Sequence, residues 1–236
     1  MSTRLNYDYI VACAEDLSWT ALAPFFRSAK AHVPHAKLVL FINRLDPETR
    51  KFLRDEGVEL HSFGALFSEG RHIAGIIRKV VWRMIIWIAR LVKYREFGSR
   101  LLQRGGGLLL PRNQARFFHH RSFLEDCTIP RVRFLFCDAR DLVFQSNPFN
   151  HISPEGMLLS QEEASVPLED NHYNQKWYRE TYGDRALELR RKLPVICSGT
   201  IGGGHIQMME FLKHIERESI NRRRRFGADQ AIVNHL

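Results

Sequence analysis

Short apolar runs alternate with amphipathic stretches along the first 63 residues. Three runs, 9–14, 37–43 and 58–63, have the length of buried strands. Apolar side chains at helical spacing follow the first run, and Asp46-Pro47, a typical helix start, follows the second. Strand, helix, strand, helix, strand in this order predicts a parallel α/β sheet joined by right-handed crossovers. No Gly-x-Gly-x-x-Gly follows the first run, so the dinucleotide-binding fingerprint is absent.

Helix ends are also marked in this part of the chain. We expect Ser18 or Thr20 to cap the first helix, with Pro24 in its first turn, where a proline is tolerated. The second helix should stop at Gly57, because glycine readily takes the backbone conformation that ends a helix. The pattern therefore predicts a doubly wound α/β start, a fold class with nucleotide-binding potential.

Residues 71–104 differ in kind from the rest. They hold nine Lys or Arg against one Glu, with apolar residues interleaved at spacings of three and four, which predicts a basic, strongly apolar helix. Two interpretations stay open. The first is a membrane-surface helix or an anion-binding arm. The second is a helical insertion, 64–112, within a single domain, 1–236, whose apolar stripe packs on the sheet while its arginines face solvent or a phosphate cleft.

The end of this segment is expected to be irregular. Gly105–Gly107 should break the helix and begin a loop that runs to Pro111. A further helix follows, and it carries His119 and His120. Adjacent histidines do not share one helix face as metal ligands would, so ordinary surface or hydrogen-bonded histidines are expected.

A buried strand that runs straight into a cluster of charge lies in the middle of the chain. The strand is Phe134–Cys137, and Asp138, Arg140 and Asp141 follow it directly. One interpretation is a turn, capped by an aspartate whose charge the arginine neutralises. The other is a cation site, because open α/β sheets bind ligands at the carboxyl ends of their strands and two acids there suit a hard cation with a phosphate ligand.

A second strand with an unusual ending comes later. Pro194–Cys197 is apolar and leads into Ser198-Gly199-Thr200-Ile201 and Gly202–Gly204, where small residues would let a ligand approach the backbone. The Gly-Lys-Ser/Thr ending of a P-loop is missing. The chain stops inside a last predicted helix, 231–236, so we expect the sequence to lack its C-terminal part.

Composition narrows the class of protein. The formal net charge of +9 favours an anionic partner: a phosphorylated ligand, nucleic acid or a membrane surface. The four cysteines have no CxxC spacing, which predicts buried free thiols and not disulfides or zinc ligands. The N-terminus has no apolar signal core and no uncharged run approaches a membrane span in length, so a cytoplasmic location is expected.

The order of these features resembles that of the GT-A glycosyltransferases, which use nucleotide sugars. The likeness is to the branch in which Asp-x-Arg-Asp precedes Val-Phe-Gln-Ser-Asn/Asp-Pro-Phe, here residues 138–149. It is specific over 134–149, moderate over 195–204 and 227–234, and only architectural over 1–63. The resemblance implies an α/β fold of GT-A type, a Rossmann-like, mixed and mostly parallel sheet flanked by helices.

The resemblance also implies a reaction, the metal-dependent transfer of a sugar from a nucleotide sugar to a carbohydrate, lipid or protein acceptor. Asp138 and Asp141 would bind Mn²⁺ or Mg²⁺, which bridges the diphosphate. The physical logic holds without the family, because a diphosphate leaving group gains negative charge that a divalent cation and a nearby arginine stabilise. Arg140 is the candidate arginine, with a salt bridge to either aspartate as the alternative.

Further roles follow from the resemblance alone. Asp229 and Gln230 would lie beside the reacting sugar as catalytic residues, with a plain helix cap as the alternative for Asp229. The remaining donor-binding positions would border the sugar or acceptor (Ser198, Gly199, Thr200), hold the nucleotide base (Cys13, Ala14, Glu15) or reach the donor phosphates (Arg116).

Three departures from the family pattern stand out. The acids are three residues apart instead of forming Asp-x-Asp, which leaves open whether Asp138 or Asp141 is the direct ligand. Cys197 stands where many relatives have Asn. The family often supplies a further metal ligand, commonly His, near the C-terminus, and His235 is too early for that role, so we expect that ligand in the missing segment.

The competing class is a non-enzymatic binder of anions, a membrane-surface or nucleic-acid protein that uses the basic helix 71–104. No nucleic-acid-binding module is recognisable, so specific binding of nucleic acid is not expected. A peripheral membrane contact through the same segment is also compatible with an enzyme, since a positive cleft suits a nucleotide diphosphate.

Overall fold

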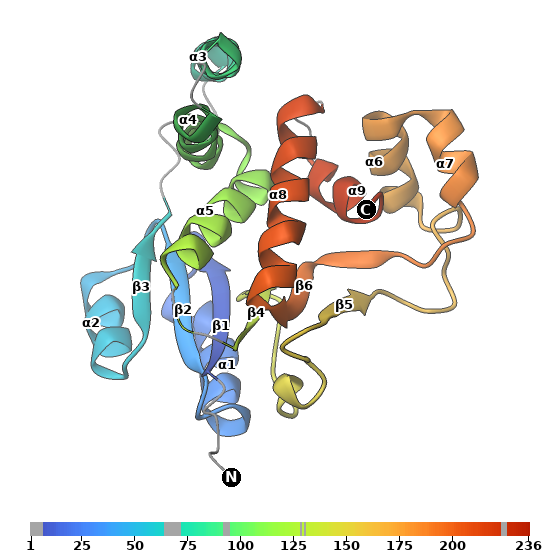
Figure 1. Ribbon diagram of the computed structural model, residues 1–236. Coiled ribbons are helices and arrows are strands. Elements are labelled where there is room, and N and C mark those ends of the chain that lie inside the picture. Colours follow the sequence, from blue (N-terminus) through green and yellow to red (C-terminus); the bar gives the residue numbers. More distant parts are fainter. Residues whose placement is uncertain (1–6, 64–71, 92–94, 128, 130, 223–225) are drawn as a thin grey trace. The chain divides into compact units, whose positions relative to one another are not determined.

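The computed structural model describes residues 7–63, 72–91, 95–127, 129, 131–222 and 226–236 (Figure 1). Its contacts divide the chain into two compact units. The first unit comprises Met1–Phe63, Asp126–Ser160 and Cys197–Glu210, and the second comprises Gly64–Glu125, Gln161–Ile196 and Phe211–Leu236. Each unit is therefore assembled from segments that are far apart in the sequence.

A six-stranded sheet organises the first unit (Figure 1). Its strand order is β3-β2-β1-β4-β6-β5. β1 pairs in parallel with β2 and with β4, β2 pairs in parallel with β3, and β6 runs antiparallel to β4. The strands are β1 Tyr7–Ala14, β2 Lys37–Ile42, β3 Glu59–Ser62, β4 Val132–Asp138, β5 Met157–Gln161 and β6 Ile196–Gly204. The expected α/β class with a mixed, mostly parallel sheet is confirmed.

Two helices and a short 3₁₀ turn complete the first unit: α1 Trp19–His32, α2 Pro47–Asp55 and η1 Pro148–Asn150. Both helix starts follow the predicted capping chemistry. Ser18 caps α1, where its hydroxyl accepts a hydrogen bond from the Ala21 amide, and the Asp46 carboxylate accepts one from the Thr49 amide at 2.8 Å. Gly57 has a backbone φ of +78°, a left-handed conformation that does not continue an α-helix. Helix α2 ends just before it, as predicted.

Pro24 is not where the sequence placed it. It lies in the interior of α1 and not in the first turn, because the helix begins at Trp19. A proline there has no N–H to donate to the preceding turn. Burial offsets that loss, since Leu22 and Phe25 beside it are at most 1% exposed.

One apolar cluster fixes these helices on one face of the sheet. Alternate residues of the central strands point to this face because successive side chains in a strand alternate. The cluster joins Ile10, Ala12, Ala14, Leu38, Leu40, Ile42, Leu135 and Cys137 of the strands to Leu22, Phe25, Phe26 and Ala29 of α1 and Leu53 of α2.

The second unit is helical. Its helices are α3 His72–Leu91, α4 Arg95–Leu109, α5 Arg112–Asp126, α6 His172–Tyr182, α7 Asp184–Arg190 and α9 Ala228–Val233, and α8 His205–Asn221 begins in the first unit and continues into the second. Tyr178, Leu187 and Ala231 form part of a small buried cluster from α6, α7 and α9. Among the residues that the structure describes, no helix is long and apolar enough to cross a membrane.

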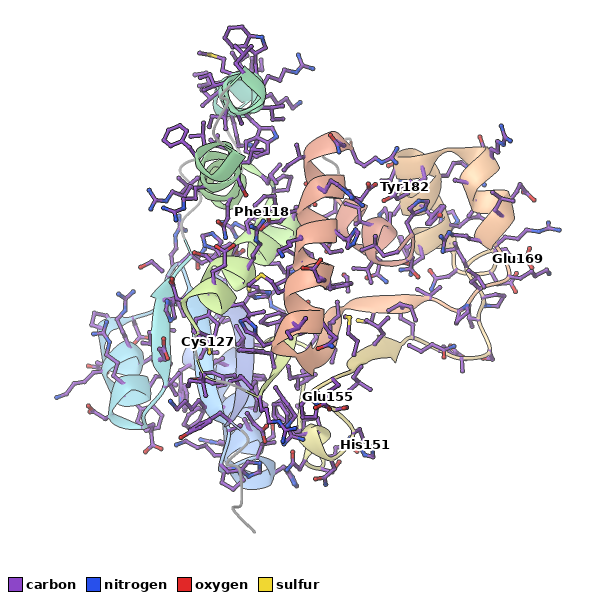
Figure 2. The ribbon with its side chains drawn as sticks, viewed as in Figure 1. Phe118, Cys127, His151, Glu155, Glu169 and Tyr182 are labelled. Carbon is purple, nitrogen blue, oxygen red and sulfur yellow. The ribbon has the colours of Figure 1, made fainter. Side chains whose placement is uncertain are left out.

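The predicted break at Gly105–Gly107 is wrong, because these glycines lie inside α4. The reason is close packing and not a turn. A Cβ at Gly105 would lie 2.9 Å from Trp82 Cζ3, and one at Gly106 would overlap the ring of Phe118, which Figure 2 labels on α5. Local sequence favours a break at three glycines, but here they let neighbouring side chains approach the helix backbone.

Of the two expected environments for the histidines, surface or hydrogen-bonded, the structure shows a hydrogen bond for His119 and excludes the surface for His120. His119 Nε2 is hydrogen-bonded to the Gly107 carbonyl at 3.2 Å, whereas His120 is 2% exposed and is no surface residue. Burial and the charge of Arg116 hold the pKa of His120 well below its ordinary value. His120 is therefore a neutral core residue.

The run Gly202–Gly204 is also explained by packing. It belongs to β6 and pairs with β4, with Gly202 opposite Leu135. A Cβ at Gly203 would lie 2.8 Å from the Gly156 carbonyl, and one at Gly204 would overlap the Pro154 carbonyl. The close approach predicted for a ligand is thus made, at these three glycines, by the chain itself.

Candidate functional site

The carboxyl ends of β1 and β4 lie side by side at the point where the strand order reverses. From β1 the chain proceeds outward through β2 and β3, and it later returns to place β4 on the other side of β1. In the register Cys13 pairs with Asp138, and the Ala139 amide donates to the Cys13 carbonyl at 3.3 Å. Such a switch point is where open α/β sheets bind ligands, because the connections diverge there and leave a crevice.

The antiparallel strand β6 brings Gly199 to the same edge. Thr200 lies opposite Cys137, one residue before Asp138. A Cβ added at Gly199 would lie 2.7 Å from Asp138 Oδ2, so the carboxylate rests against the backbone of residue 199. The Gly199 amide donates to Cys197 Sγ at 3.4 Å. Glycine is thus the residue that leaves room for the Asp138 carboxylate at this edge.

The other predicted residues of this unit differ in exposure. Arg140 and Asp141 are exposed, Asp138 is half-buried and Ser198 is buried. At the end of β1, Ala14 is buried while Cys13 and Glu15 are half-buried. The structure therefore brings Cys13, Asp138, Gly199 and Thr200 together and presents Arg140 and Asp141 to solvent just beyond them.

Two residues at this edge were missed by the sequence reasoning. Asp16 follows β1 with φ +49°, and its amide donates to Asn43 Oδ1 at 2.9 Å. Asn43 Nδ2 donates back to Asp16 Oδ1 at 3.3 Å, which ties the ends of β1 and β2 together. The available signal was an Asp just beyond the first predicted strand and an Asn at the end of the second, since Asp and Asn are common in turns and tolerate left-handed backbone.

The residues present fit a hard cation only in a limited way. No group of three or more His, Cys, Asp or Glu that could hold a metal occurs within the described residues. Asp138 and Asp141 would thus supply at most two carboxylates. Mg²⁺ commonly takes one or two carboxylates and fills its other positions with phosphate oxygens and water, so this donor set suits a cation that arrives with a diphosphate.

Asp229 and Arg116 form a different kind of cluster in the second unit. Arg116 Nη2 donates to Asp229 Oδ2 at 3.0 Å, and Asn113 Nδ2 donates to Asp229 Oδ1 at 2.6 Å. Both members of the ion pair are buried, with Arg116 8% and Asp229 5% exposed. Both carboxylate oxygens are occupied, and the pair joins the start of α9 to α5.

Gln230 is engaged in the same way. Its side-chain amide donates to Glu162 Oε1 at 3.0 Å and to the Ile196 carbonyl at 2.7 Å. Asn234 also donates to the Ile196 carbonyl and accepts from the Ile196 amide. These contacts hold α9 against Glu162 and against Ile196, the first residue of β6.

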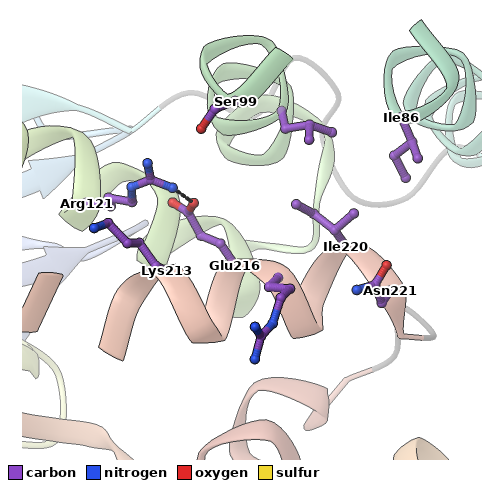
Figure 3. Close-up of a pocket in the computed structure, with 9 residues that line it drawn as sticks. Ile86, Ser99, Arg121, Lys213, Glu216, Ile220 and Asn221 are labelled. Carbon is purple, nitrogen blue, oxygen red and sulfur yellow. Dashed lines mark hydrogen bonds and ion pairs between the residues drawn. The ribbon is translucent and has the colours of Figure 1, made fainter. Parts of the chain in front are cut away.

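The second unit also contains a pocket of about 290 Å³ that no sequence pattern pointed to (Figure 3). Arg121 and Glu216 line it, and Arg121 donates to the Glu216 carboxylate. Burial raises the pKa of Glu216 to about 8, although Arg121 opposes the shift. The pocket is lined by Ile86, Ser99, Leu102, Arg121, Lys213, Glu216, Arg217, Ile220 and Asn221.

Comparison with known proteins adds no relative: no protein-family model matches the chain, and no curated protein matches it significantly. The sheet topology and the residues at its carboxyl edge are therefore the basis for a functional assignment.

Proposed function

We propose that the chain is a glycosyltransferase that transfers a sugar from a nucleotide sugar, with its donor site at the carboxyl ends of β1 and β4. One observation carries the proposal: Asp138 ends β4 at the reversal of strand order, beside Cys13 and against the backbone of Gly199. A half-buried carboxylate at that point of an α/β sheet suits a ligand and not core packing.

In this proposal Asp138 and Asp141 hold a Mn²⁺ or Mg²⁺ ion. When bound, the cation neutralises the negative charge that develops on the leaving diphosphate. Arg140, exposed next to both acids, donates hydrogen bonds to the same phosphate oxygens. Cys13, Ala14 and Glu15 border the nucleotide, because they end the neighbouring strand.

Residues of β6 would orient the transferred sugar. Ser198 and Thr200 each carry a hydroxyl that can donate to or accept from a sugar hydroxyl. Gly199 between them keeps the carboxylate of Asp138 free of steric conflict. The contacts of Asp229, Gln230 and Arg116 support a structural role for these three residues in place of the catalytic and phosphate-binding roles that the resemblance implies.

A cytoplasmic location is part of the proposal. Cys13, Cys127, Cys137 and Cys197 are all free thiols. Free thiols accord with a reducing compartment, where disulfides are rare.

Thermal stability measured with ligands tests the proposal. A nucleoside diphosphate with Mn²⁺ should raise the melting temperature of the wild type, because a ligand that binds only the folded state stabilises it by linkage. The variant Asp138→Ala/Asp141→Ala should lose this shift. The control Asp55→Ala/Asp170→Ala removes two exposed carboxylates elsewhere and should keep it.

The outcomes separate the two classes of function. An equal shift in the wild type and in Asp138→Ala/Asp141→Ala would place the metal elsewhere. No shift with any nucleoside diphosphate would favour the second candidate, a non-enzymatic binder of anions, which the exposed basic helix α3 supports. Metal-dependent hydrolysis of a panel of nucleotide sugars would then identify the donor.

A further inference from the structure

Helix α3 exposes an apolar face that nothing in the described structure covers. Trp87 is 63% exposed, Leu91 61% and Ile76 58%. Soluble proteins seldom expose large contiguous apolar patches unless the patch contacts a partner or a membrane. The exposed side chains are Ile76, Ile77, Val80, Val81, Met84, Trp87, Ile88 and Leu91.

These eight side chains form one stripe along the helix. At about 100° per residue they occupy an arc of roughly 140°, and the stripe runs from Ile76 to Leu91. The opposite side of α3 carries Trp82, which is fully buried. A Cβ at Gly105 of α4 would lie 2.9 Å from Trp82 and 3.1 Å from Ile85, so α3 packs on α4 through this other side. The exposed stripe is therefore not the face that builds the fold.

Positive charge flanks the stripe. On the helical wheel Lys79 and Arg83, both exposed, lie along one border, and Arg78 lies along the other. The sequence of α3, His72–Leu91, contains no Asp or Glu. An apolar face bordered by basic residues, with a tryptophan on it, is the arrangement of a helix that lies in the interface of a membrane.

Charge decides between the occupants of this face. Two copies of α3 packed face to face would bring basic borders together with no acid on either helix to compensate. An anionic lipid surface offers the complementary charge to Lys79 and Arg83 and an apolar layer to the stripe.

We propose that α3 docks the protein on an anionic lipid surface, with the stripe in the boundary between headgroups and acyl chains. The basic border residues then contact lipid phosphates and carboxylates. The helix lies in the plane of the interface. The proposal concerns a surface of the second unit and does not depend on the nature of the chemistry at Asp138.

Vesicle flotation of the full chain tests this. We expect binding to phosphatidylcholine vesicles that contain phosphatidylserine, weakening as salt is raised, and much weaker binding to phosphatidylcholine alone. Met84→Ser/Trp87→Ser/Leu91→Ser should lower partitioning to the anionic vesicles at least about tenfold. Lys79→Glu/Arg83→Glu should also lower partitioning to the anionic vesicles at least about tenfold. Raised salt should reduce the difference in partitioning between this variant and the wild type.

Matched variants control for general surface effects. Leu189→Ser/Ile206→Ser/Phe226→Ser removes three other exposed apolar side chains, and Lys51→Glu/Arg54→Glu reverses two basic residues on α2. Both should float as the wild type does. Trp87→Phe should still bind, but it should lose the part of the fluorescence blue shift that vesicles cause in the wild type, because Trp87 is the tryptophan on the stripe.

Three results would overturn the proposal. The first is no flotation of the wild type with anionic vesicles. The second is equal flotation of the wild type and the triple-serine variant, whose unchanged melting temperature would show that it folds. The third is a wild-type dimer by light scattering that the triple-serine variant converts to monomer without any vesicle binding, which would assign the face to a second copy of the chain.

Discussion

Asp138 and Asp229 are both aspartates beside a predicted strand or helix end, and the structure gives them opposite surroundings. Asp138 is half-buried at the carboxyl edge of a sheet, against the backbone of a glycine. Asp229 is 5% exposed, with one oxygen bonded to Arg116 and the other to Asn113. The difference in burial and bonding is the reason why we propose a ligand-binding role for Asp138 and a structural role for Asp229.

The largest expected effect is the loss of stability when Asp229 is replaced. Asp229→Ala should lower the free energy of unfolding by about 3–5 kcal/mol, because it leaves the buried Arg116 without its counter-charge. Asn113→Ala is the matched control, since it removes one hydrogen bond to the same carboxylate and should cost only about 1 kcal/mol. Urea unfolding followed by circular dichroism measures both. A loss below 1 kcal/mol for Asp229→Ala, with activity abolished, would support the catalytic role that the resemblance implies and contradict the structural one.

For Asp138 we expect a large loss of activity and only a small change in stability. Asp138→Ala should lower the rate of metal-dependent donor turnover by about 10²–10³-fold, the size expected for removing one electrostatic contact to the transition state. Its free energy of unfolding should stay within about 0.5 kcal/mol of the wild type, because the half-buried Asp138 side chain at the sheet edge keeps part of its contact with water. Asp55→Ala serves as control for both measurements. A large loss of stability would make Asp138 a second structural acid.

Gly199 and Gly204 of β6 allow a similar comparison between a residue of the candidate site and a residue needed for packing, with smaller expected effects. Gly199→Ala would place a Cβ against the end of the flexible Asp138 side chain, so the chain should fold with little loss of stability while nucleotide and metal binding weaken about tenfold. Gly204→Ala would place a Cβ against the Pro154 carbonyl and should cost about 1–3 kcal/mol. Melting temperatures with and without ligand separate the two effects. Equal behaviour of the two variants would contradict the assignment of Gly199 to the site.

Much of the first unit follows from local sequence because its signals are local. Runs of four to seven residues predict β1, β2 and β4, and the Asp46 cap lies three residues from the amide that it binds. Glycines were misjudged wherever long-range packing outweighs local preference. At Gly106 the determining neighbour is Phe118 and at Gly204 it is Pro154, and neither contact is visible in a pattern of local propensities.

In the candidate site, too, local features could be predicted from the sequence and long-range contacts could not. The resemblance and the strand ending drew attention to Asp138, and the β1–β4 pairing gives that residue Cys13 as a neighbour. The link between Asp16 and Asn43 joins residues 27 positions apart, and the Asp229–Arg116 pair joins residues 113 apart. Only the folded chain reveals such contacts, so the sequence could not show that both oxygen atoms of Asp229 are already hydrogen-bonded.

Glu216 offers the last way to test the comparison, because it is a second buried acid beside an arginine. Burial raises its pKa from 4.5 to about 8, so between these values the folded state holds one more proton than the unfolded state. The free energy of unfolding should therefore fall as pH rises through this range, by at most about 1.4 kcal/mol per pH unit from this group. Glu216→Gln keeps a neutral side chain beside Arg121 and should lose this component of the fall.

Denaturant midpoints between pH 4.5 and about 8 give the measurement. The difference between the wild type and Glu216→Gln should change steadily with pH, in the direction of a relatively more stable variant at the alkaline end. Asn221→Ala, which changes a pocket residue without a titrating group, should run parallel to the wild type. If Glu216→Gln also runs parallel, Glu216 is ionised in the folded state and pairs with Arg121 as Asp229 pairs with Arg116. Burial would then not be enough to protonate an acid beside an arginine in this unit.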